Sequence, residues 1–134
     1  MARTTLDDRD RELLQGKNFA HVATVREDGT VHNVPVWVDV EGDNVVLNSA
    51  EGRVWPENVR RTGQATLTVA NMENPYEYVS VTGHLAEDTH EGADEHIDKM
   101  AQKYLGQDKY PYHQPGDVRV IIRIAPDRVQ RAGS

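Results

Sequence analysis

The chain has 134 residues, of which 22 are acidic and 15 basic, giving a formal net charge of -7 at pH 7. This length is typical of one domain, so residues 1–134 are expected to form a single unit. The absence of cysteine excludes disulfides, thiol nucleophiles and thiolate metal sites. The acidic balance disfavours nucleic acid as a partner, because that binding needs Lys and Arg on phosphates. No segment reaches the ~20 apolar residues of a membrane span and the start lacks an apolar signal region, so a cytoplasmic protein is expected.

The first forty residues predict a helix followed by a β-hairpin. Residues 5–15 have helical periodicity, with Thr5 as the expected cap and three leucines on the apolar side. A strand is predicted at 19–25, and Glu-Asp-Gly at 27–29 is a strong hairpin turn. The next strand, at 31–40, alternates between a valine face and a face that holds Asn33, Pro35 and Trp37.

Further strands are predicted at residues 45–49, 64–71, 76–87 and 118–125. Gly83 is a candidate bulge or close-approach point within the long fifth strand. Pro56 is expected at the first position of a short helix that ends near Gly63, and a second helix is expected at about 91–105. Six short strands joined mostly by hairpins favour a mainly β fold, an antiparallel barrel with flanking helices.

The segment 49–61 is the best candidate for an anion site on physical grounds. If Pro56 opens the helix, the amides of Glu57 and Asn58 have no helical acceptor and face outward with a favourable dipole. Arg53 and Arg60 could add charge-assisted hydrogen bonds to a phosphate, and Ser49 one more. A solvated helix with surface arginines is the simpler alternative from the residues alone.

The face with Asn33, Pro35 and Trp37 is a second candidate, because a flat conjugated ring needs an apolar plane and polar groups at its edge. Its alternative is a half-buried strand packed on a partner sheet, with Trp37 filling the interface. The six histidines have no metal-binding spacing, and hydrogen-bonded or surface positions are expected for them. The tyrosines at 104, 110 and 112 are expected to pack around a loop, where one could line a substrate opening.

Three stretches resemble the split barrels of the pyridoxamine-phosphate-oxidase-like superfamily, and more narrowly the branch that uses the deazaflavin coenzyme F420. They are the opening hairpin at 19–37, the Glu-Gly-Arg-Val-Trp-Pro-Glu-Asn-Val-Arg-Arg run at 51–61 and the strand at 74–85. Closing elements at 103–106 and 119–126 are also similar. The resemblance implies a six-stranded antiparallel split β-barrel that holds a flavin or deazaflavin at the interface of a homodimer.

The resemblance also implies a function and a set of site residues. It implies an F420-dependent oxidoreductase that transfers a hydride from reduced deazaflavin to a conjugated small-molecule substrate. An FMN-dependent enzyme of the same fold and a non-catalytic cofactor- or haem-binding module are the alternatives. Many relatives have a phosphate-binding lysine at the position of Trp55, and a tryptophan cannot take that role. The expected cofactor-binding residues are Asn33, Pro35, Val36, Trp37, Asn48, Ser49, Ala50, Arg53, Trp55, Pro56, Asn58 and Arg60.

Overall fold

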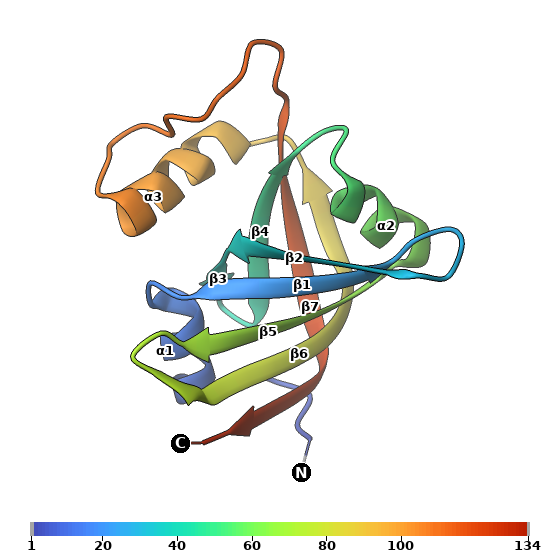
Figure 1. Cartoon of the computed structure of the whole chain (residues 1–134), viewed down its shortest axis with the longest axis vertical. Helices are drawn as coiled ribbons and strands as arrows, with labels where there is room; N and C mark the ends of the chain where they lie inside the picture. Colours follow the sequence, from blue (N-terminus) through green and yellow to red (C-terminus); the bar gives the residue numbers. More distant parts are fainter. Residues whose placement is uncertain (1, 134) are drawn as a thin grey trace.

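A seven-stranded antiparallel sheet is the framework of the computed structural model, which describes residues 2–133 (Figure 1). Met1 and Ser134, the ends of the predicted single unit, lie outside the described residues. The elements in chain order are α1 (Asp8–Gln15), β1 (Phe19–Val25), β2 (Val31–Trp37), β3 (Asp39–Glu41), β4 (Asn44–Ala50), α2 (Val54–Thr62), β5 (Gln64–Asn71), β6 (Asn74–Thr89), α3 (Ala93–Leu105) and β7 (Arg119–Ala132).

The strand order explains both the barrel and its opening. The strands are arranged β2-β1-β5-β6-β7-β4-β3, so the two edge strands are consecutive in the chain and are joined at Val38. The twisted sheet curls so that its two edge strands, β2 and β3, come together at Val38 (Figure 1). Within residues 2–133, β2 pairs only with β1, which leaves its other edge free beside β4. The barrel is therefore split along this edge.

Strand alternation places the core inside the barrel. Alternate residues of β1, β4, β5 and β7 point into the barrel, where Val22, Leu47, Leu67 and Ile122 are fully buried. The predicted mainly β class with flanking helices is confirmed. The predicted number of strands is wrong by one, because the strand expected at 31–40 breaks at Val38 into β2 and β3.

Two further boundaries differ from the prediction. The last strand continues to Ala132 instead of ending at 125, because β6 is long enough to pair with it throughout. The first helix begins at Asp8, and Asp7 rather than Thr5 caps it. Asp7 accepts from the Asp10 amide at 2.9 Å, and Asp10 accepts from the Asp7 amide at 2.8 Å.

Gly83 is a close-approach point, as predicted. The β6–β7 register shifts beside it, and a β-carbon at this position would lie 2.4 Å from the carbonyl oxygen of Ala125. Any larger residue would push the two strands apart, so glycine is required here to keep β7 paired.

The helices cover different parts of the barrel. α2 packs on β1 and β5, whereas α3 packs on β4 and β7 and is followed by a long loop that leads to β7 (Figure 1). None of the helices within residues 2–133 has the length and apolar character needed to cross a membrane. α2 and α3 thus stand on either side of the split.

Candidate functional site

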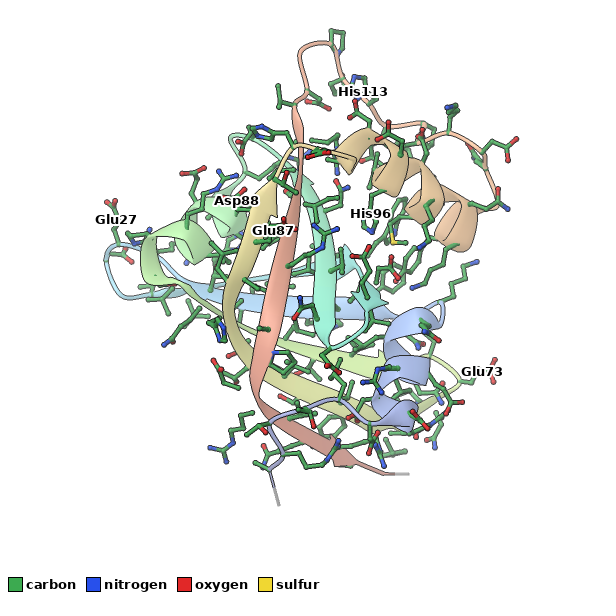
Figure 2. The ribbon with its side chains drawn as sticks, turned by 180° about the vertical axis from the view of Figure 1, so that it is seen from behind. Glu27, Glu73, Glu87, Asp88, His96 and His113 are labelled. Atoms are coloured by element: carbon green, nitrogen blue, oxygen red, sulfur yellow. The ribbon has the colours of Figure 1, made fainter. Side chains whose placement is uncertain are left out.

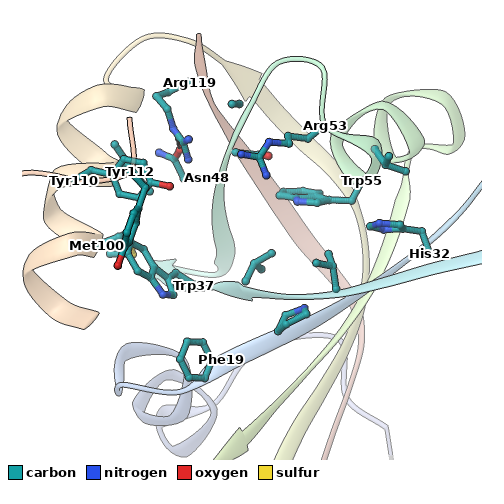
Figure 3. Close-up of a pocket in the computed structure, with 17 residues that line it drawn as sticks. Phe19, His32, Trp37, Asn48, Arg53, Trp55, Met100, Tyr110, Tyr112 and Arg119 are labelled. Carbon is teal, nitrogen blue, oxygen red and sulfur yellow. Dashed lines mark hydrogen bonds between the residues drawn. The ribbon is translucent and has the colours of Figure 1, made fainter. Parts of the chain in front are cut away.

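A cavity of about 620 Å³ opens at the split in the barrel. It is bounded by β2, the end of β4, the start of α2, one side of α3 and the loop before β7 (Figure 3). Because β2 is an edge strand, the cavity contacts both of its faces: Val34 and Val36 from the barrel side, and Pro35 and Trp37 from the outer side. This volume is in the range of small-molecule and cofactor sites.

One wall of the cavity is aromatic. The rings of Trp37 and Tyr104 stack with centroids 5.0 Å apart and an angle of 4° between their planes. Tyr110 meets Trp37 edge-on at 5.8 Å, and Tyr112 meets Tyr110 edge-on at 5.6 Å. Figure 3 shows Trp37, Tyr110 and Tyr112 gathered beside α3. Each ring is held by another, so this wall is rigid as well as apolar.

The break at Val38 fixes the direction of Trp37. The hydroxyl of Tyr104 accepts a hydrogen bond from the Val38 amide at 3.0 Å, and the Lys103 ammonium donates to the Val38 carbonyl at 2.6 Å. Both backbone groups that leave the ladder at the break are therefore satisfied by α3. Burial lowers the pKa of Lys103 to about 8 and raises that of Tyr104 to about 12.

The opposite end of the cavity is formed by the start of α2, but not as predicted. Arg53 is the N-cap and Val54 the first helical residue, so Pro56 is the third and not the first. The outward amides are then those of Val54 and Trp55 instead of Glu57 and Asn58, since Glu57 and Asn58 have acceptors within the helix. No side chain caps this end. The amides and the helix dipole thus favour an anion beside Arg53.

A second cation, Arg119, was not predicted. It is the first residue of β7 and is 6% exposed, with its Nε donating to Asn48 Oδ1 at 3.0 Å and its guanidinium 5.0 Å from the Tyr110 ring centre. Burial lowers its pKa, and the neighbouring charge of Arg53 lowers it further. Arginine nevertheless stays charged. Among the described residues, neither Arg53 nor Arg119 has a carboxylate oxygen within 4.0 Å, although most other arginines of the chain do.

The cavity brings together eight of the twelve predicted cofactor-binding residues. They are Pro35, Val36, Trp37, Asn48, Ser49, Ala50, Arg53 and Trp55. Trp55, where the resemblance implies a phosphate-binding lysine in many relatives, is 5% exposed and packs in the main core while it borders the cavity. It contributes a flat apolar surface next to Arg53 (Figure 3).

Four predicted residues do not line the cavity, and each has a physical reason. Asn33 is exposed on the outer face of β2, two residues nearer the hairpin turn than Pro35, and does not border the cavity. Pro56 is buried beneath the start of α2, and Asn58 is buried with its amide donating to Thr24 Oγ1 at 3.1 Å. Arg60 points away from the cavity, toward carboxylates.

Arg60 is held by three carboxylates on the far side of α2. Its nitrogens lie 2.8 Å from Glu51, 2.6 Å from Glu57 and 2.5 Å from Asp88. Asp88 stands at the end of β6 on the side facing α2 (Figure 2). Hydrogen bonds to Asp88 and Glu51 raise the pKa of Arg60 above its usual value. Arg60, predicted as a cofactor-binding residue, thus lies outside the cavity in an ion-pair network.

Nine further residues line the cavity. They are Phe19, His32, Val34, Val54, Ile97, Met100, Tyr110, Tyr112 and Arg119. The loop tyrosines have a recognisable signal in the sequence, their clustering near a turn. Arg119 has no such signal, since a single arginine at the start of a strand is an ordinary surface pattern. The described residues contain no cluster of three metal-ligating side chains.

The residues present fit an anionic group joined to a flat conjugated ring. The buried guanidinium of Arg119 and the exposed guanidinium of Arg53, both without carboxylate partners, suit a phosphate together with the two free amides of α2. The aromatic wall and the free edge of β2 suit a ring that is apolar on its faces and polar at its edge. The cavity can therefore bind and orient such a ligand.

Comparisons with solved structures support the same fold. An F420 reductase is 24% identical, with a TM-score of 0.80 over 93% of this chain and 98% of that chain. A conserved hypothetical protein from Mycobacterium tuberculosis is 17% identical, with a TM-score of 0.72 over 96% of this chain and 86% of that one. HupZ from Group A Streptococcus is 19% identical, with a TM-score of 0.65 over 96% and 98%. A search of curated proteins gave no significant match.

The family is shown by a sequence profile. The profile described as pyridoxamine 5'-phosphate oxidase matches residues 6–132, which include every helix and strand of the structure. The chain therefore belongs to the pyridoxamine 5'-phosphate oxidase family.

Proposed function

We propose that the chain is an F420-dependent oxidoreductase, a single split-barrel domain that works as a homodimer. When bound, reduced F420 supplies a hydride to a conjugated, electron-poor organic substrate. The residues of this chain bind the cofactor, orient it and exclude water. Oxidoreductase chemistry agrees with the family, and the choice of F420 agrees with the F420 reductase among its structural neighbours.

One observation carries the proposal: two arginines without carboxylate partners, Arg53 at the start of α2 and Arg119 beside Tyr110, line the same cavity as an aromatic wall. Arg53, Arg119 and the free amides of α2 would hold the anionic part of the cofactor. Trp37 and the free edge of β2 would flank the ring. The electrostatic repulsion between the two guanidinium groups falls when an anion binds between them.

The residues of the loop before β7 would close the cavity. Tyr110 is half-buried against Trp37 and Arg119, while Tyr112 is more exposed and lies nearer the solvent. We expect the substrate to enter on this side. Its proton would come from water or from one of these two hydroxyls.

The homodimer is proposed from exposed aromatic surface. Tyr76 is 84% exposed at the start of β6, and Tyr78, on the same face of that strand, is also exposed. Exposed aromatic residues on strands are enriched at interfaces. Trp37, for which filling a partner interface was one sequence-based alternative, is half-buried within the chain by Tyr104 and Tyr110.

Titration of the purified protein with F420 and with FMN tests the cofactor. Fluorescence polarisation of each is expected to rise on binding, with F420 the tighter ligand because its tail carries more negative charge. Turnover of bound reduced F420 with activated enones would then distinguish an enzyme from a carrier. Tight binding of FMN and none of F420 would replace the proposal by an FMN enzyme of the same fold.

A further inference from the structure

A chain of hydrogen bonds leads from the cavity into the space between α3 and the sheet. Arg119 Nε donates to Asn48 Oδ1 at 3.0 Å, and Asn48 Nδ2 lies 3.1 Å from His96 Nδ1. On the other side of the ring, His96 Nε2 lies 3.1 Å from Asp39 Oδ2. Figure 2 shows His96 on the side of α3 that faces the sheet.

The strand register brings these residues together. Asp39 pairs with Val46, which is two residues before Asn48 on the same face of β4. Arg119 pairs with Ala50, two residues after Asn48. Side chains at alternate positions share a face, so all of them point toward α3, where His96 belongs to the buried side of the helix.

The direction of each hydrogen bond in this chain is fixed by its two ends. Arg119 can only donate, so the Asn48 oxygen must face it. The Asn48 amide nitrogen also donates to the carbonyl of Ala93 at 2.9 Å, and that carbonyl can only accept. The nitrogen therefore faces His96 as well, which requires His96 Nδ1 to be an unprotonated acceptor. Its proton then lies on Nε2 and is donated to Asp39.

Because His96 and Asp39 are buried, any other protonation of this hydrogen-bond chain would leave a buried polar group unpaired, which costs free energy. His96 is 7% exposed and Asp39 is 6% exposed. Asp39 remains ionised: burial raises its pKa, but hydrogen bonds from His96 and the Val40 amide and the charge of Lys99 outweigh burial and lower it to about 2. A second proton on His96, at Nδ1, would place two donors opposite each other, because the Asn48 amide nitrogen also donates. Turning the Asn48 amide over would only move the conflict, since its nitrogen would then face the Arg119 donor.

We propose that His96 is a positioning residue, which as the neutral Nε2–H tautomer keeps the Asn48 oxygen on Arg119 and so holds that guanidinium in place as the second anion-binding cation of the cavity. This inference rests on the proposed anion-binding function of the cavity. It adds that anion affinity depends on a histidine that does not line the cavity.

The first test is the tautomer of His96, read from ring ¹⁵N shifts in a long-range ¹H–¹⁵N NMR spectrum of the wild-type protein at pH 7. We expect one pyridine-type nitrogen at Nδ1 and one protonated nitrogen at Nε2. A proton on Nδ1, alone or together with Nε2, would overturn the inference. This readout needs no cofactor, no turnover and no variant.

The second test is the affinity for inorganic sulfate and for F420, measured by NMR titration and fluorescence. His96→Leu should weaken both by about tenfold, comparable to the loss of an outer hydrogen-bond partner at a metal site. His96→Asn keeps an acceptor at the Nδ1 position and should restore most of the affinity. His90→Leu is the matched control: His90 is exposed, bound to Glu51 and outside the cavity, so affinity should not change.

The dependence of sulfate affinity on pH is a third test, because a purely structural role of His96 would not change it. Sulfate keeps its charge between pH 5 and 8, so its affinity reports the protein. The groups facing the His96 ring and its partner are Asp39 from β3, Lys99 and Lys103 from α3, and Arg119 from β7. Lys103, whose pKa burial lowers to about 8, changes charge at the upper end of this range in the wild type and in His96→Asn alike, so a difference between their profiles reports the residue at position 96. Sulfate affinity should fall toward pH 5 in the wild type, and more steeply than in His96→Asn.

The outcomes separate this inference from the function on which it rests. If wild type binds neither sulfate nor F420, the proposed function and the inference both fail. A second outcome would overturn the inference alone. In it, wild type binds sulfate and F420 and Arg119→Ala weakens this binding, but His96→Leu, shown to be folded by its ¹H–¹⁵N spectrum, does not weaken it. If His96→Leu does not fold, His96→Asn and the wild-type tautomer decide: equal pH profiles, or an Nδ1 proton, overturn it.

Discussion

Replacing Arg53 by alanine isolates the anion-binding role of the arginine at the start of α2. Arg53 is exposed and, within residues 2–133, has no carboxylate within 4.0 Å, so its side chain does little for folding. We expect the free energy of unfolding to change by less than about 0.5 kcal/mol. A hydrogen bond to a charged group is worth about 1.5–3 kcal/mol, so F420 affinity should fall roughly 10- to 150-fold.

Arg60→Ala is the matched control, since Arg60 lies about two helical turns farther along α2 and faces away from the cavity. Its ion pairs with three carboxylates are partly exposed, so its loss should cost about 1 kcal/mol of stability. Its effect on F420 affinity should be under twofold. Urea denaturation and fluorescence titration of both variants measure the two quantities. Equal affinity in Arg53→Ala and wild type, or a large loss in Arg60→Ala, would refute this assignment.

Three other variants test the core of the site. Trp55→Lys should lose about 3 kcal/mol of stability, because a buried aromatic side chain is removed. The variant should still bind F420, with an affinity that depends more steeply on salt. If wild type binds no cofactor and this variant does, Trp55 blocks the site. Tyr104→Phe leaves the Val38 amide without its partner and should cost about 1–3 kcal/mol in urea denaturation, and no change would contradict the account of the strand break. The pKa of Asp39 is lowered in the folded state, so its contribution to the free energy of unfolding is present above pH 4 and is lost as pH falls toward 2. Asp39→Asn should therefore make stability less dependent on pH between 4 and 2, and an unchanged pH dependence there would argue against a paired Asp39.

The sequence determined the strands and helices through their local signals. Alternating valines placed the strands, and the Glu-Asp-Gly turn at 27–29 marked the first hairpin. Gly83 was recognised because a glycine inside a strand marks a close approach. Eight of the twelve expected cofactor-binding residues lie at the cavity because they belong to two short continuous segments, and segments stay together in any fold that contains them.

Only the tertiary structure decided the break at Val38 and the second cation. The valine alternation continues through residue 38, and the chain can leave the ladder there because Tyr104 and Lys103, distant in sequence, bind the freed backbone groups. Arg60 was expected to bind the phosphate, but it forms ion pairs with Glu51 and Asp88 from two other segments. Arg119 lines the cavity, and Arg60 does not. The choice between these arginines depends on which partners lie near in space. Local patterns carry periodicity and turn chemistry, but they do not carry the register of β7 on β4, which sets Arg119 beside Asn48.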